Sequence, residues 1–120
     1  MNIDELKTTL RAFAEERDWD QFHSPKNLSM ALSVEVAELL EHFQWLTETE
    51  SRELPPGTAQ KVAEEIADIQ IYLVRLADKL GVDIDAAVTA KIELNRFRYP
   101  PEKARGSAAK YTSYEPDPKT

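Results

Sequence analysis

Apolar side chains recur every three or four residues along most of this 120-residue chain, and no segment shows the alternation typical of a strand. This spacing places the apolar side chains on one face of a helix. It predicts four helices, at residues 4–17, 25–46, 58–80 and 84–98. Four helices with short connections favour an all-α, four-helix bundle-like domain over residues 1–100. Residues 101–120 are rich in Pro, Ser, Ala and Lys and are expected to form an extended or partly disordered tail.

Capping residues and helix breakers support these boundaries. Ser24 is a predicted N-cap, and Pro25 suits the first helical position because its missing N–H has no partner to lose there. Thr58 follows a proline-glycine breaker and is a candidate cap for the third helix. Gly81 can end that helix in the left-handed conformation. Pro100 then stops the fourth helix.

The composition excludes several classes of function. The chain has no cysteine, so disulfides, thiol catalysis and thiolate metal sites are ruled out. Its 15 basic and 22 acidic residues give a net charge of −7, which disfavours binding to a nucleic-acid backbone. No apolar run approaches the roughly 18 residues that a membrane span needs. We therefore expect a cytoplasmic protein with neither a nucleic-acid nor a membrane partner.

Carboxylates interrupt the apolar stripes of the two central helices. In the second helix, Glu35 falls within the stripe and Glu38 lies at its edge, one turn further on. In the third helix, Glu65 borders the stripe and Asp68 follows at the same spacing. Four converging carboxylates would repel one another without a cation between them, and their oxygens suit Mg²⁺ or Mn²⁺. The alternative is two solvated acidic faces with surface salt bridges.

The fourth helix supplies groups of the opposite character. Lys91 and Asn95 continue the line of Ile84 and Val88, and Arg98 follows in the last turn. Cationic and amide donors that face a bundle interior opposite a metal site suit phosphate oxygens. A buried ion pair between Lys91 and a carboxylate is the alternative.

Two tryptophans and a histidine flank the second helix. Trp19 and His23 lie in the loop before it, and Trp45 lies near its predicted end. An indole ring offers a flat surface for a nucleobase, with a stacked base contributing about 1–3 kcal/mol. The alternatives are packing of the tryptophans in the core and a structural hydrogen bond from His23 at the start of the helix.

These residues resemble those of one known family. The two acidic pairs, Glu35-x-x-Glu38 and Glu65-x-x-Asp68, resemble the metal-binding signature of the MazG-like, all-α nucleoside triphosphate pyrophosphatases. The resemblance is nearest to the dCTP pyrophosphatase branch, and it is carried by RDWDQFHSPKNL (17–28), FQW (43–45), DIQIYL (68–73) and KIELNRFRYP (91–100). The broader family often has a further glutamate just before the first metal ligand, where this chain has Val34.

The resemblance implies an activity and an assembly. The chain would hydrolyse a nucleoside triphosphate to the monophosphate and pyrophosphate, with Mg²⁺ held by the four carboxylates. Water would attack the α-phosphorus, with Glu38 favoured as the acceptor of its proton. The chain would form dimers or tetramers, with sites near the subunit interfaces.

The resemblance also implies how the substrate would lie. Trp19, His23 and Trp45 would frame the base, with the amine of a pyrimidine read by hydrogen bonds. Tyr72 would pack beneath the deoxyribose and disfavour a 2′-hydroxyl. The phosphates or the sugar would be bound by Lys91, Asn95, Arg98 and Tyr99.

Other functions stay open at this point. A hydrolase of dUTP or dUDP would share the helices and carboxylates, and so would a phosphoribosyl-ATP pyrophosphohydrolase, although the tryptophans favour a site that reads a base. A house-cleaning enzyme for modified pyrimidine triphosphates fits as well, because indole stacking tolerates many bases. The alternative outside enzymes is a helical interaction module. The tail could also close over the site through Lys110 and Tyr111.

Overall fold

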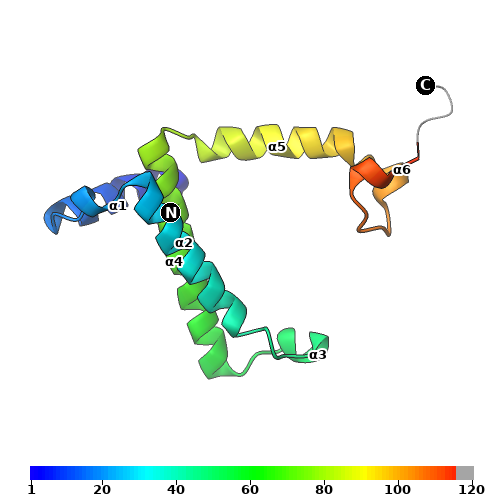
Figure 1. The fold of residues 1–120 in the computed structure, drawn as a ribbon, viewed down its shortest axis with the longest axis horizontal. Coiled ribbons are helices and arrows are strands. Elements are labelled where there is room, and N and C mark those ends of the chain that lie inside the picture. The colour runs from blue at the N-terminus through cyan, green and yellow to red at the C-terminus, as the bar shows by residue number, and fades with distance from the viewer. Residues whose placement is uncertain (116–120) are drawn as a thin grey trace. The chain divides into compact units, whose positions relative to one another are not determined.

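The computed structural model describes residues 1–115, and every regular element in that range is helical (Figure 1). Two compact units are present, one formed by Met1–Ile84 and one that begins at Asp85. The elements in order are α1 (Ile3–Glu16), η1 (Asp20–Phe22), α2 (Pro25–Glu41), α3 (Glu48–Ser51), α4 (Pro56–Leu80), α5 (Ile84–Arg98), α6 (Pro101–Ala104) and η2 (Tyr111–Ser113). The prediction of an all-α chain is confirmed for the described residues, whereas the four-helix bundle stays a prediction.

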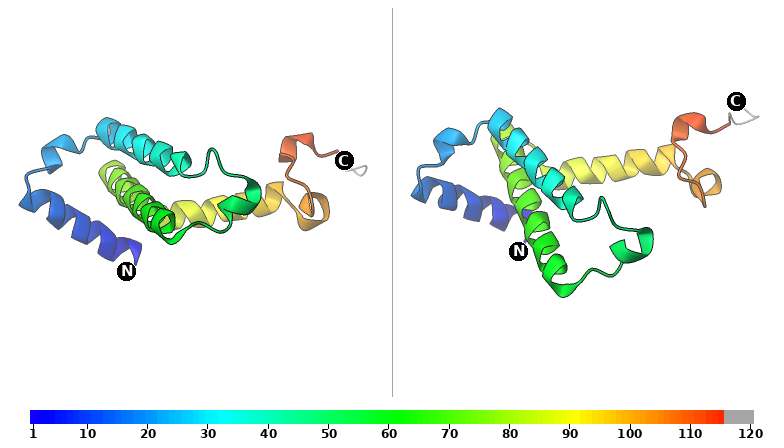
Figure 2. Two further views of the ribbon diagram at one scale, coloured as in Figure 1. Left: turned by 90° about the horizontal axis from the view of Figure 1, so that it is seen from below. Right: turned by 60° about the horizontal axis from the view of Figure 1, so that its bottom comes forward.

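At the centre of the first unit, α2 and α4 run antiparallel and side by side (Figure 2). The first helix, α1, also packs against α4. The buried apolar side chains of these three helices form the core of the unit. They are Ala14, Leu28, Val62, Val74 and Ala77. The core therefore includes part of the predicted apolar stripes, and α4 is the helix that contacts both of the others.

The predicted caps are largely confirmed. The Ser24 side chain accepts a hydrogen bond from the backbone N–H of Asn27 at 3.1 Å, with Pro25 as the first residue of α2. Gly81 ends α4 at φ 68°, a left-handed conformation that favours glycine. The assignment of Thr58 as a cap is wrong, because α4 already begins at Pro56 and Thr58 lies within its first turn. Proline tolerates that position, so the helix needs no later cap.

The second helix ends earlier than predicted, at Glu41 instead of residue 46. A pair of turns follows, in which the N–H groups of Phe43 and Gln44 both bond to the carbonyl of Leu40 at 2.9 Å. The cause lies just beyond, where Thr47 is extended and forms a capping box with Glu50 that starts α3. The capping box requires the chain to leave the helical conformation before Thr47.

Much of the predicted apolar surface of α4 is exposed in the single chain. Ile66 is 55% exposed and Leu73 is 41% exposed, although both have the spacing of the apolar stripe that the sequence predicts for this helix. The outer face of α2 is similarly apolar, with Val34 and Leu40 both exposed. One face of each helix is thus covered within the unit, while an apolar face of each is not.

The second unit contains α5, α6 and η2, and aromatic rings hold its end together. The Tyr99 ring meets the rings of Tyr111 and Tyr114 edge-on, each at 5.9 Å between centroids. The Arg98 guanidinium lies 4.7 Å from the centroid of the Tyr111 ring. The expected extended tail thus contains two short helical turns up to residue 115, and residues 116–120 lie outside the described range. A domain boundary at residue 100 stays a prediction.

The structure predicts that Leu28 of α2 is important for the stability of the first unit. Replacing Leu28, which is 1% exposed, with alanine leaves a cavity at the junction and should lower the free energy of unfolding by about 2–5 kcal/mol. Urea denaturation followed by circular dichroism measures this change. Leu80→Ala is the matched control, because Leu80 is 57% exposed and its truncation should cost far less. Equal losses for both variants would contradict this core.

Candidate metal centre

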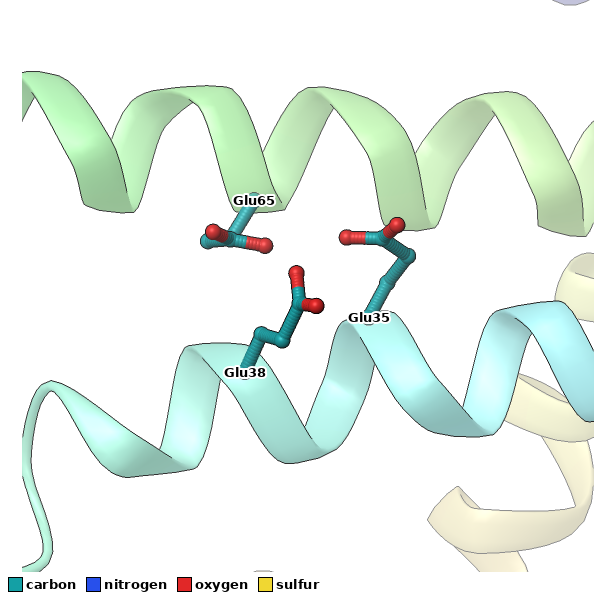
Figure 3. Close-up of side chains that lie close together, drawn as sticks. All are labelled: Glu35, Glu38 and Glu65. Atoms are coloured by element: carbon teal, nitrogen blue, oxygen red, sulfur yellow. The ribbon is translucent and has the colours of Figure 1, made fainter.

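Three glutamates converge between α2 and α4 (Figure 3). Glu35 and Glu38 reach from α2 toward α4, and Glu65 reaches back from α4. One carboxylate oxygen from each lies within 4.8 Å of the corresponding oxygen of the other two. The i, i+3 spacing on α2 and the close pairing of the two helices produce this cluster, as the sequence predicted for these three residues.

Two oxygens of this cluster lack a partner among the described residues. Oε2 of Glu35 and Oε2 of Glu65 are both buried and accept no hydrogen bond. An unpartnered buried carboxylate oxygen is costly. Burial, and after it the neighbouring carboxyl groups of Glu65 and Glu38, together raise the pKa of Glu35 to about 7.

The donor set fits a hard divalent cation. All of the clustered atoms are carboxylate oxygens, which Mg²⁺ and Mn²⁺ prefer over the nitrogen and sulfur ligands of softer metals. Within residues 1–115, no lysine or arginine forms an ion pair with these three carboxylates. A bound cation would supply the missing positive charge and partner the two orphaned oxygens. These residues therefore fit the predicted metal.

Asp68 stands slightly apart from the other three carboxylates. It lies one turn beyond Glu65 on α4 and is half-buried, but its oxygens are outside the cluster of mutually close ligand atoms. Its negative charge nevertheless contributes to the raised pKa of Glu35. The role of Asp68 as a fourth ligand stays a prediction.

His42 is a neighbour of the cluster that the sequence analysis missed. Its Nε2 atom lies 3.8 Å from Oε1 of Glu65, and both side chains are largely covered. His42 follows Glu38 by four residues, so the helical spacing placed it on the acidic face and was the available signal. Its imidazole is the nearest group that can lend positive charge to Glu65.

The loop between α1 and α2 exposes aromatic rings. The Trp19 indole is 45% exposed and packs edge-on against Phe13, with ring centroids 5.7 Å apart. Phe22 is also exposed, and His23 is half-buried beside it. Trp45, in the turn after α2, is 87% exposed, so neither tryptophan is a core residue of the single chain. Exposed indoles are available to stack on a planar ligand.

A buried arginine links this loop to α4, and the sequence analysis missed it too. Arg75 is 5% exposed, and its guanidinium donates to both Asp20 and His23 of the loop. Its only signal was a charged residue within the otherwise apolar segment 71–77 of the chain. The predicted alternative for His23, a structural hydrogen bond, is thus met in part, because Nδ1 of His23 accepts from Arg75.

The other residues predicted to bind the nucleotide lie partly on α4 and partly in the second unit. Tyr72 is half-buried on α4, one turn beyond Asp68. In the second unit, Lys91 and Asn95 are exposed on successive turns of α5, and Arg98 and Tyr99, which were also predicted to bind the phosphates or the sugar, are half-buried. A joint role of these groups with the carboxylates stays a prediction.

The cluster predicts an unusual pH dependence for the metal-free protein. Because the pKa of Glu35 is about 7 when folded and near 4.5 when unfolded, the folded state binds the extra proton between these values. Stability should therefore fall as the pH rises from about 4.5 to about 7, by roughly 2 kcal/mol. Urea unfolding in the presence of a chelator measures the effect.

The control for this pH dependence is a neighbouring glutamate. Glu35→Gln should flatten the profile in that window, whereas Glu64→Gln, at an exposed position of α4, should preserve it. A profile that is already flat in the unaltered protein would contradict the described packing of Glu35.

The sequence and the fold of this chain are similar to those of known pyrophosphatases. The sequence is 46% identical to mouse dCTP pyrophosphatase 1 and 45% identical to the human protein of that name, each over 112 residues and 92% of this chain. The chain spans about two thirds, 66%, of the length of these curated relatives. The fold is similar to a pyrophosphatase from Archaeoglobus fulgidus, with a TM-score of 0.76 and 44% identity over 81% of this chain and 91% of that one.

The family assignment follows from a further match. The sequence model of the MazG-like family matches residues 30–113, which include both acidic pairs and all of α4 and α5. No helix among the described residues is long and apolar enough to cross a membrane. By this match over most of its length, the chain belongs to the MazG-like family.

Proposed function

We propose that this protein is a divalent cation-dependent nucleoside triphosphate pyrophosphohydrolase. Its substrates would be dCTP or 5-modified and non-canonical pyrimidine deoxynucleoside triphosphates, with the monophosphate and pyrophosphate as products. The observation that carries the proposal is the cluster of Glu35, Glu38 and Glu65, with two buried oxygens that have no partner within residues 1–115. The similarity of the chain to relatives named dCTP pyrophosphatase 1 supports the choice of substrate.

The carboxylates would hold Mg²⁺, with Mn²⁺ as a substitute, through Glu35, Glu38 and Glu65 and with Asp68 as the predicted fourth ligand. The bound cation would supply electrostatic stabilisation of the charge that develops on the phosphates. A water oxygen would form a bond to the α-phosphorus, and the bond from that phosphorus to the bridging oxygen would break. The proton of the water would pass to a carboxylate oxygen of Glu38, and pyrophosphate would leave.

Other side chains would bind and orient the nucleotide. Trp19, His23 and Trp45 would frame the base, since both indoles are exposed and free to stack. Tyr72 would lie beneath the deoxyribose. The cationic and amide donors of α5 and its end, Lys91, Asn95, Arg98 and Tyr99, would contact the phosphates or the sugar.

We also propose that copies of the chain associate, as a dimer or tetramer. The exposed apolar residues of α2 and α4, among them Val34, Leu40, Ile66 and Leu73, are too numerous for faces that stay in water. A second copy is the occupant with the same apolar character on both sides of such an interface. A cytoplasmic location stays a prediction.

A substrate panel tests the proposed function. The purified protein with Mg²⁺ would receive each deoxynucleoside triphosphate, each ribonucleoside triphosphate, dUDP and 5-substituted dCTPs, with products separated by chromatography. We expect selective conversion of dCTP and its 5-modified forms to the monophosphate plus pyrophosphate. Preference for dUTP or dUDP would favour the related hydrolase, and no turnover of any nucleotide would favour an interaction module.

Variants of the cluster provide the control. Glu35→Gln removes one carboxylate without changing the shape of the side chain, and we expect at least a 100-fold loss of turnover with the helical content retained. Glu64→Gln, on the exposed face of the same helix pair, should keep turnover within about twofold of the unaltered protein. Full Mg²⁺-dependent activity in Glu35→Gln would overturn the assignment of Glu35.

A further inference from the structure

We propose that Arg75 is a positioning residue that fixes the tautomer of His23, so that His23 presents an N–H donor to an acceptor atom of the pyrimidine base. The inference rests on the proposed function, and it deepens that function by naming the atom type that His23 reads. It involves four side chains that lie outside the carboxylate cluster: Asp20, His23, Arg75 and Lys79.

The contact that sets the tautomer is a hydrogen bond between two buried or half-buried groups. Nε of Arg75 donates to Nδ1 of His23 at 3.2 Å. A guanidinium has only donors and stays protonated, so Nδ1 must provide a lone pair. The one N–H of the neutral imidazole therefore lies on Nε2. Because Arg75 is 5% exposed, water has little opportunity to replace it in this contact.

The surrounding charges keep the imidazole neutral. Burial lowers the pKa of His23, and the positive charges of Arg75 and Lys79 lower it further, against the weaker opposing effect of Asp20. Asp20 is itself held by both cations, through a bond of 2.6 Å from Nη2 of Arg75 and an ion pair with Lys79. These are the charged groups that face His23 from α4 and from its own loop.

A neutral imidazole with its N–H on Nε2 can donate a hydrogen bond from Nε2 but cannot accept one there. It can donate to the O2 carbonyl of a pyrimidine, or to N3 of cytosine, both of which are acceptors. It cannot accept from the exocyclic amine of cytosine, which is a donor. Of the hydrogen-bonding groups of cytosine, His23 therefore suits the acceptors O2 and N3, and the amine must be read by another group.

Removal of Arg75 should leave the fold intact, which makes the proposal testable. Asp20 keeps Lys79 as its partner, and Asp78 keeps Arg11, whose Nε donates to it at 2.7 Å. No carboxylate near Arg75 is then left without a cation. Arg75 also lies two turns beyond Asp68, roughly 10 Å along the axis of α4, so its replacement does not touch the metal ligands.

The first measurement is nitrogen NMR of the His23 ring in three full-length proteins: unaltered, Arg75→Met and Lys79→Met. The unaltered protein and Lys79→Met should show a single neutral tautomer with the proton on Nε2. Arg75→Met, which keeps the apolar stem and loses the donor, should show exchange between both tautomers. A mixture of tautomers in the unaltered protein would overturn the proposal.

The second measurement is the kinetics of hydrolysis of dCTP with Mg²⁺. We expect Arg75→Met to raise KM about 3- to 10-fold with kcat nearly unchanged, since the lost contact is made equally before and during the reaction. Glu64→Gln, at an exposed position of α4 outside this network, should leave KM within about twofold. On a His23→Ala background, Arg75→Met should have no further effect, because Arg75 acts through the imidazole.

The outcomes separate the two proposals. If the His23 tautomer is fixed but the protein hydrolyses no nucleotide, the proposed function is overturned. The role of His23 in reading a base is then overturned as well. An active enzyme in which Arg75→Met leaves KM unchanged, or has its full effect without His23, would overturn the role of Arg75 alone.

Discussion

Mutual repulsion among the carboxylates of Glu35, Glu38 and Glu65 is the constraint on which the rest of this structure depends. The packing of α2 along α4 brings these like charges together and buries part of them, although neither lysine nor arginine pairs with them in the described chain. In the metal-free protein, burial and the neighbouring carboxylates raise the pKa of Glu35 to about 7, so a proton on Glu35 relieves part of the repulsion. A divalent cation relieves it completely, which ties the fold of this helix pair to the proposed chemistry.

Other residues of the first unit stabilise the packing of α2 against α4. Leu28 and Val74 fill the contact between the helices, and Gly81 ends α4 cleanly. Arg75 fastens the aromatic loop to the same helix that carries Glu65. Under the proposed function, α4 would serve both ends of the nucleotide: its carboxylates would hold the metal near the phosphates, and Arg75 would anchor the loop that binds the base.

Periodicity and capping residues made much of this predictable from the sequence. Ser24, Pro25 and Gly81 act locally, and their effects on the chain do not depend on distant contacts. The cluster was predictable because acidic residues within apolar stripes must meet when the stripes pack. The early end of α2, the His42 contact and the Arg75 network were not, because each depends on a competing cap or on a partner more than 20 residues away. The exposure of Ile66 and Leu73 on α4 was not predictable either, since an apolar stripe does not show whether the same chain covers it.

The most direct test of the central claim is thermal unfolding of the protein with increasing Mg²⁺, against NaCl at matched ionic strength. A cation site formed only in the folded state predicts a Tm that rises with the logarithm of the Mg²⁺ concentration, reaching about 2.7 kcal/mol of added stability at 100 times Kd. Glu35→Gln should weaken that rise, and Glu64→Gln should not. A Tm that responds to Mg²⁺ no more than to NaCl would contradict the account, because the three carboxylates would then be a solvated acidic face.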